Sequence, residues 1–71
     1  MSIEVVAPMQ GKIVEVIAKV GDKVGEDDEL LILEALKMEN PVGSPSDGTV
    51  KEIMVKEGDS VESEQVLMVL E

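Results

Sequence analysis

The sequence predicts an all-β domain, a flattened β-barrel or sandwich of about eight short strands with pseudo-two-fold symmetry. Short segments rich in Val and Ile alternate with Gly, Pro, Asp and Ser at close spacing, which is typical of small β-sandwiches and barrels. The chain also repeats itself: residues 7–34 align without a gap with residues 44–71, with ten identities in twenty-eight positions. A unit this short buries its apolar face only against a copy, so both halves should close on one core.

In chain order, the β-branched and apolar segments predict strands at residues 3–6, 11–17, 23–25, 29–34, 38–42, 48–55, 60–62 and 65–71. Turns are expected at 8–11, 20–22, 44–48 and 57–59, because Gly permits positive φ there and Asp bonds to its own backbone. Asp47-Gly48 is the strongest hairpin signal among them.

The strict alternation of apolar residues fails in the same way in both halves. Ile13 and Val16 are three residues apart, as are Val50 and Ile53 in the copy. A β-bulge is therefore expected in each of these strands.

Two apolar segments are unbroken, residues 30–33 and 66–70. Each is too short for a helix of three turns, so we predict strands buried on both faces. We expect them to pair with each other across the pseudo-axis at the centre of the core.

Two further groups of side chains are interpreted as structural. Met9, Met54 and Met68 are expected to fill gaps in the core, as flexible thioethers do. The acidic segment 26–29 lacks the glycine and the terminal glutamate of a calcium loop, so we interpret it as a solvated turn and predict no metal site.

The composition excludes several classes of function. The 71 residues form one domain, 1–71, with no Cys, His or aromatic residue and a net charge of -10. The chain lacks a thiolate and the commonest general base, so catalysis by the chain itself is not expected. The charge repels nucleic acid, and no apolar segment approaches the roughly 20 residues of a membrane helix. We expect a cytoplasmic protein that is monomeric as an isolated domain.

Lys37 is the candidate functional residue because of its place between the two halves. If a pseudo-two-fold axis relates them, the connection at residues 35–37 is equivalent to the gap between the chain ends, and Lys37 lies on a tight turn. Leu36 and Met38 flank it, where a soluble turn ordinarily carries Gly, Asn or Asp. Exposed apolar residues at a hairpin tip indicate recognition by a partner. The alternative is that Leu36 or Met38 folds back onto the core.

The segment Glu34-Ala35-Leu36-Lys37-Met38 resembles the Glu-Ala-Met-Lys-Met attachment motif of biotinyl domains. The resemblance extends to the turns at 7–11, 20–24 and 46–50, and so covers nearly the whole chain. The chain therefore resembles the biotinyl/lipoyl attachment domain family, of the biotin carboxyl carrier type. Its length resembles a small stand-alone biotin/lipoyl attachment protein or an excised domain. Leu36 departs from the motif by a roughly volume-conserving change.

The resemblance implies a barrel-sandwich hybrid with Lys37 on a hairpin turn. It implies that a biotin protein ligase acylates Lys37 from biotinyl-adenylate, giving a non-catalytic biotin carrier. The carrier would take a carboxyl group from a biotin carboxylase site to a carboxyltransferase site. Leu36 and Met38 would be flanking recognition residues, and Glu34 and Ala35 would complete the attachment motif.

Two other functions stay open at the level of the sequence. Lipoyl domains share the fold, so Lys37 would carry lipoate, added by a lipoate ligase, or would be used for both cofactors. Lipoyl domains typically have an acidic or small polar residue before the lysine and no Met after it, so Leu36 and Met38 favour biotin. The other alternative is an unmodified acidic β-module for protein assembly, whose function Lys37→Arg would leave intact.

Overall fold

Strands account for all the regular secondary structure of residues 2–71, the part of the chain that the computed structural model describes. Their bounds are β1 Ile3–Val6, β2 Gly11–Val16, β3 Lys23–Val24, β4 Glu29–Ala35, β5 Met38–Gly43, β6 Gly48–Ile53, β7 Ser60–Val61 and β8 Val66–Leu70. Every predicted strand is present, and each end lies within two residues of its prediction. The described residues contain no helix that is long and apolar enough to cross a membrane.

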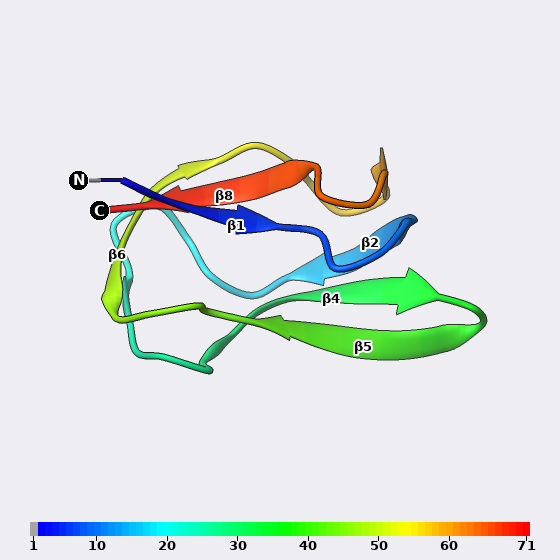
Figure 1. Ribbon diagram of the computed structural model, residues 1–71, viewed down its shortest axis with the longest axis horizontal. Coiled ribbons are helices and arrows are strands. Elements are labelled where there is room, and N and C mark those ends of the chain that lie inside the picture. Colours follow the sequence, from blue (N-terminus) through cyan, green and yellow to red (C-terminus); the bar gives the residue numbers. More distant parts are fainter. Residues whose placement is uncertain (1) are drawn as a thin grey trace.

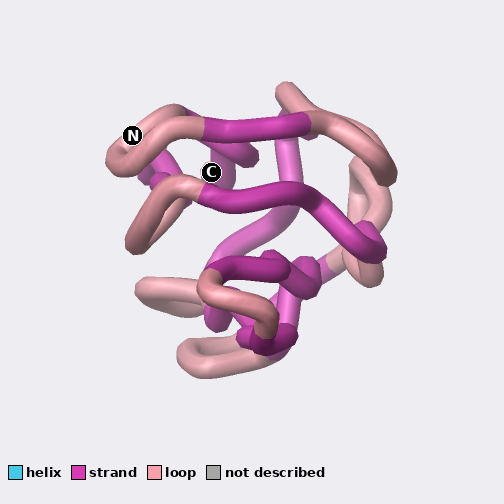
Figure 2. The backbone as a smooth tube through the Cα atoms, turned by 90° about the vertical axis from the view of Figure 1, so that its right-hand side faces the viewer, coloured by secondary structure: helices cyan, strands magenta, loops and turns pink. Residues whose placement is uncertain are grey.

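The strands form two four-stranded antiparallel sheets, in the orders β1-β8-β6-β3 and β5-β4-β2-β7. Figure 1 shows β1 and β8 of the first sheet above β4 and β5 of the second, and Figure 2 shows the strands viewed along the long axis of the molecule. The molecule measures 33 × 17 × 17 Å. The predicted all-β fold is confirmed.

The predicted pseudo-two-fold symmetry is confirmed by the register of the strands. Shifting β2, β3 and β4 by 37 positions gives β6, β7 and β8, and β5 takes the place of β1 in the opposite sheet. The pair Leu33 and Asn40 thus corresponds to the pair Leu70 and Ile3. The β4–β5 turn is therefore equivalent to the opening between the two chain ends, as the repeat predicted.

The same turn is built twice, once in each half. Gly21 and Gly58 both have a φ of 95°, which favours glycine because it has no Cβ. The next residue, Asp22 or Asp59, accepts a hydrogen bond on its carboxylate from the backbone N–H three residues earlier, at 2.9 and 3.0 Å. These are the self-bonding Asp turns expected from the sequence.

The two predicted bulges are also present. The register of β2 against β4 shifts between Ile13 and Glu15, and that of β6 against β8 shifts between Val50 and Glu52. Ile13 and Val50 are both buried. The bulges therefore keep Ile13 and Val50 in the core, although apolar and polar residues no longer alternate strictly along these strands.

One core connects the two sheets, and β4 and β8 contribute most to it. Its buried members are Val5, Ala7, Ile13, Ala18, Leu30, Leu31, Leu33, Val42, Val50, Val55, Val61, Leu67, Met68 and Leu70. Residues 30–33 and 66–70 are buried strands as predicted, but the expected pairing between them is wrong. Each is an inner strand of its own sheet, with neighbours on both edges, so no edge is left for the other.

The prediction of a hairpin at Asp47-Gly48 is wrong. Residues 44–47 cross from β5 in one sheet to β6 in the other, so the flanking strands do not pair. Asp47 and Gly48 do not close a hairpin. The Asp47 carboxylate accepts a hydrogen bond of 2.8 Å from the backbone N–H of Glu26. It thereby holds the crossover against the acidic segment 26–29, where Asp28 accepts a hydrogen bond from Gly25 N–H within an exposed turn.

The interpretation of the methionines holds for Met68, which is buried, and is wrong for the other two. Met54 is 55% exposed, and its counterpart in the first half, Ile17, is also exposed. This position, just past the bulged strand, faces solvent in both copies. Met9 is 38% exposed and lies in the loop before β2.

Candidate functional site

The β4–β5 hairpin ends in a two-residue loop made of Leu36 and Lys37, closed by the pair Ala35 and Met38. Figure 1 shows this tip at the opposite end of the molecule from the N and C labels. Both loop residues have positive φ, 54° for Leu36 and 64° for Lys37. Positive φ at both central residues is the signature of a type I′ turn, whose twist matches that of the strands.

The turn carries residues that its backbone disfavours. Type I′ loops prefer Asn-Gly, and a left-handed conformation costs other L-residues about 1–2 kcal/mol each. The other positive-φ positions among residues 2–71 come in equivalent pairs, one in each half: Gly21 and Gly58, and Asp27 and Glu64. Leu36 and Lys37 are thus held in place by the β4–β5 ladder, and retained strain of this kind points to function.

The side chains around the turn project into solvent. Leu36 is 89% exposed and Met38 is 64% exposed, so the alternative in which either folds back onto the core is wrong. Lys37 is exposed, and the only ion pair within residues 2–71 joins Lys51 to Glu71 at 3.9 Å. Within that range the Lys37 ammonium thus has no carboxylate partner, and an acyl group on it would break no salt bridge.

The other predicted site residues divide into an anchor and exposed charges. Ala35 is buried and fixes the base of the turn. Glu34 lies directly opposite Glu39 across the hairpin and opposite Lys12 on β2, and all three are exposed. Like charges placed opposite one another are destabilising. The two glutamates therefore do not stabilise the hairpin and are available to a partner.

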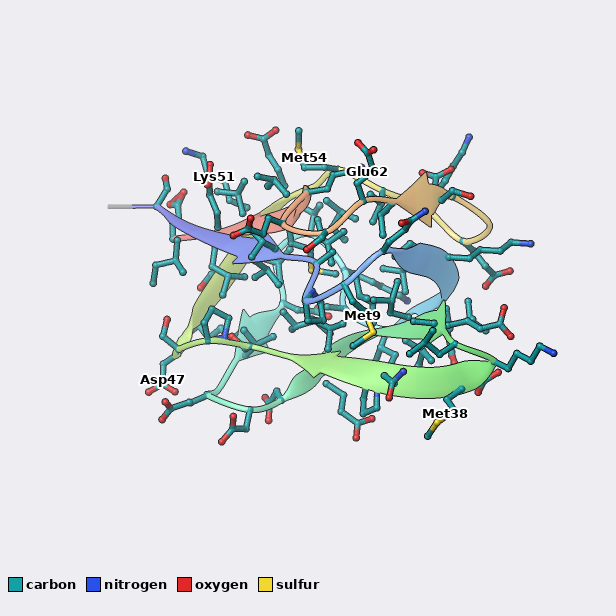
Figure 3. All side chains as sticks on the ribbon, turned by 45° about the vertical axis from the view of Figure 1, so that its right-hand side comes forward. Met9, Met38, Asp47, Lys51, Met54 and Glu62 are labelled. Atoms are coloured by element: carbon teal, nitrogen blue, oxygen red, sulfur yellow. The ribbon has the colours of Figure 1, made fainter. Side chains whose placement is uncertain are left out.

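Sequence reasoning missed one part of the site, a groove beside the hairpin. This hairpin groove has a volume of about 590 Å³ and is lined by Met9, Gln10, Gly11, Lys12, Glu34, Ala35, Leu36, Ser60 and Val61. Figure 3 shows Met9 on the inner side of the hairpin and Met38 on its outer side. The groove joins three segments distant in sequence, and only the pairing of β2 with both β4 and β7 brings them together.

Replacing Leu36 should relieve the backbone strain of the turn and, as a separate effect, weaken recognition of the turn by an enzyme. Leu36→Asn is expected to raise the free energy of unfolding by about 0.5–1 kcal/mol, because Asn tolerates positive φ. The resemblance to biotinyl domains implies that a biotin ligase acylates Lys37, and Leu36→Asn should slow that acylation because an exposed apolar contact is lost. Chemical denaturation and the rate of mass increase measure the two effects. Met38→Asn is the matched control, which should slow acylation without stabilising, and an unchanged stability of Leu36→Asn would contradict strain in the turn.

Comparison with known proteins places this chain in a family. Residues 3–70 match the biotin/lipoyl family model described as "Biotin-requiring enzyme". The chain belongs to this family and is a biotinyl/lipoyl attachment domain.

Three relatives illustrate the match. The gamma subunit of glutaconyl-CoA decarboxylase from Acidaminococcus fermentans is 58% identical over 41 residues, which are 58% of this chain and 28% of that protein. The biotin carboxyl carrier protein of acetyl-CoA carboxylase from Solanum lycopersicum is 55% identical over 38 residues, 54% of each chain. The urea carboxylase structure from Kluyveromyces lactis superposes with a TM-score of 0.94 at 32% identity, over 100% of this chain and 6% of that one. Each matched region is only part of the relative's own length.

Proposed function

We propose that Lys37 is the covalent attachment residue for biotin and that the domain is a non-catalytic carboxyl carrier. The observation that carries the proposal is an exposed lysine on a strained two-residue turn, between two exposed apolar side chains. This arrangement suits an amine that is presented to enzymes and that does not itself catalyse. Biotin, when bound, supplies a ring nitrogen that accepts and releases a carboxyl group.

The attachment step needs only an unprotonated amine from this chain. Lys37 Nζ attacks the acyl carbon of biotinyl-adenylate, the new C–N bond forms, and the bond from that carbon to the phosphate oxygen breaks. AMP leaves with the electron pair, and the nitrogen's proton passes to solvent. The amide is uncharged, so the net charge goes from -10 to -11. The ligase supplies the activated acyl group.

The partners follow from the carrier role. Relatives named as carboxylase and decarboxylase subunits support a biotin carboxylase and a carboxyltransferase as the two enzymes served. A tether keeps the reacting group at high effective concentration for both sites. Leu36 and Met38 would contact the ligase, and the acidic surface would steer the domain to basic rims. Its monomeric state and cytoplasmic location stay predictions.

The experiment is the intact mass with peptide mapping, after co-expression with a biotin ligase and separately with a lipoate ligase. We expect a single biotinyl increment on Lys37 and none with the lipoate ligase. Lipoyl modification alone would redirect the function to acyl transfer, and modification by both ligases would mean a dual carrier. The absence of an increment under both conditions would overturn the proposal in favour of an assembly module.

A further inference from the structure

The hairpin groove lies beside the β4–β5 turn, and Leu36 of that turn forms part of its lining. We propose that it is a resting site for the cyclic-urea ring of the cofactor tethered to Lys37, which docks there between visits to partner enzymes. The proposal rests on the proposed attachment of biotin. It makes Met9, Lys12 and Glu34 binding residues.

The tether reaches the groove. Leu36, next to Lys37, lines the rim, and Glu34 lies three residues before Lys37, about 10 Å along a strand. The lysine side chain with a five-carbon acyl chain contains ten single bonds, roughly 12 Å when extended. A tether of this length spans the distance from Lys37 to Glu34, so the ring can reach the lining of the groove.

One wall of the groove is apolar. Val61 and Ala35 are buried beneath it, and Met9 borders it with a partly exposed, adaptable thioether. Gly11 adds no side chain, and a Cβ there would collide with the backbone carbonyl oxygen of Glu34. A flat ring with an apolar thioether edge finds a matching surface here. Covering it would also shield Met9 from water.

The polar side chains match the hydrogen-bonding groups of a cyclic urea. Lys12 and Glu34 are directly opposite in the β2–β4 pair and both line the groove. The one salt bridge within residues 2–71 joins Lys51 to Glu71 and involves neither Lys12 nor Glu34. A cyclic urea has one carbonyl acceptor and two N–H donors. The Lys12 ammonium can donate to the carbonyl, and the Glu34 carboxylate can accept from the N–H groups.

A second groove on the other side of these residues fits the ring less well. It is lined by Lys12, Ile13, Val14, Glu34, Glu39, Glu57 and Gly58, and it is smaller, about 350 Å³. Three carboxylates face one ammonium there, and neither Met9 nor Val61 contributes. The hairpin groove pairs one charge of each sign with an apolar wall, so we assign the ring to it.

The test uses the whole protein labelled with ¹³C at the methionine methyl groups, with and without biotin on Lys37. The Met9 methyl resonance is expected to shift on biotinylation and to show nuclear Overhauser contacts with ring protons. Met54 is the internal control: Figure 3 shows it on the far side of the molecule from Met38, and its resonance should stay unchanged. Met38 should shift in any case because it adjoins Lys37.

Variants separate the docked ring from a general effect of acylation. Lys12→Met keeps the side-chain stem and removes the donor, and it should lower the docked-to-free ratio about threefold, as for an exposed charged contact. Lys51→Met on β6 is the matched control and should leave the Met9 shift unchanged.

The outcomes distinguish this inference from the proposed function. A biotinyl increment on Lys37 with an unchanged Met9 resonance would overturn the resting site and leave the carrier function standing. A Met9 shift that Lys12→Met does not reduce would overturn recognition of the urea. The absence of any increment would overturn both.

Discussion

Replacing Lys37 with Arg is expected to abolish incorporation of biotin, with no detectable mass increment from any length of exposure to the ligase. The guanidinium of Arg stays protonated at accessible pH and does not act as an acyl acceptor. The change keeps the positive charge and a long exposed side chain. The free energy of unfolding should therefore stay within about 0.5 kcal/mol of that of the parent protein. Intact mass and thermal unfolding measure the two quantities.

Lys56→Arg is the matched control for this loss. Lys56 is exposed and belongs to the repeated turn of the second half, where its backbone N–H, and not its ammonium, bonds to Asp59. Biotin incorporation should be unaffected there. A biotinyl increment on another lysine of Lys37→Arg would contradict selection of the target by the hairpin. Retained function of Lys37→Arg in a partner assay would favour the assembly module.

Leu33→Ala and Leu70→Ala are each expected to destabilise the fold by about 2–5 kcal/mol, because both leucines are fully buried. A loss of this size is a large share of the roughly 5–15 kcal/mol that holds a typical domain folded. The two residues occupy equivalent positions in the two halves. We therefore expect the two losses to agree within a factor of about two, the usual spread for such changes.

Far-ultraviolet circular dichroism during urea unfolding measures these losses, because the chain has no aromatic residue to report by fluorescence. Val20→Ala is the control, since Val20 is largely exposed and should change stability by no more than about 0.5 kcal/mol. A small loss at only one of the two leucines would show that the halves do not share the core equally.

The internal repeat is what made the fold predictable from sequence. It fixed which residues are equivalent, so the bulges after Ile13 and Val50, the glycine turns and the unique position of Lys37 could each be inferred from two copies. A single strand pattern gives weaker information, because apolar alternation fails at a bulge. The sequence left open whether Leu36 or Met38 folds back onto the core, and the structure decides for exposure of both.

The failed predictions concern long-range placement, to which the repeat is insensitive. Asp47-Gly48 has the local chemistry of a hairpin, but whether two strands pair or cross between sheets depends on the partners of both. The hydropathy of Met54 does not reveal whether its side chain is buried. Its exposure depends on which face of the molecule this position points to. The hairpin groove was missed because its walls come from three strands whose adjacency is set by the sheet order.

The strands nearest the two chain ends lie at the opposite end of the molecule from the lysine turn, and this separation affects how far Lys37 can move. Ile3 and Leu70 pair beside each other at one end of a body 33 Å long, and the lysine turn lies at the other end. A connection through either terminus would pivot at the end remote from Lys37. The stiff β body would then sweep an arc set by its own length, several times wider than the lysine side chain alone could trace. Lengthening such a connection would enlarge the swept volume without altering the β4–β5 turn.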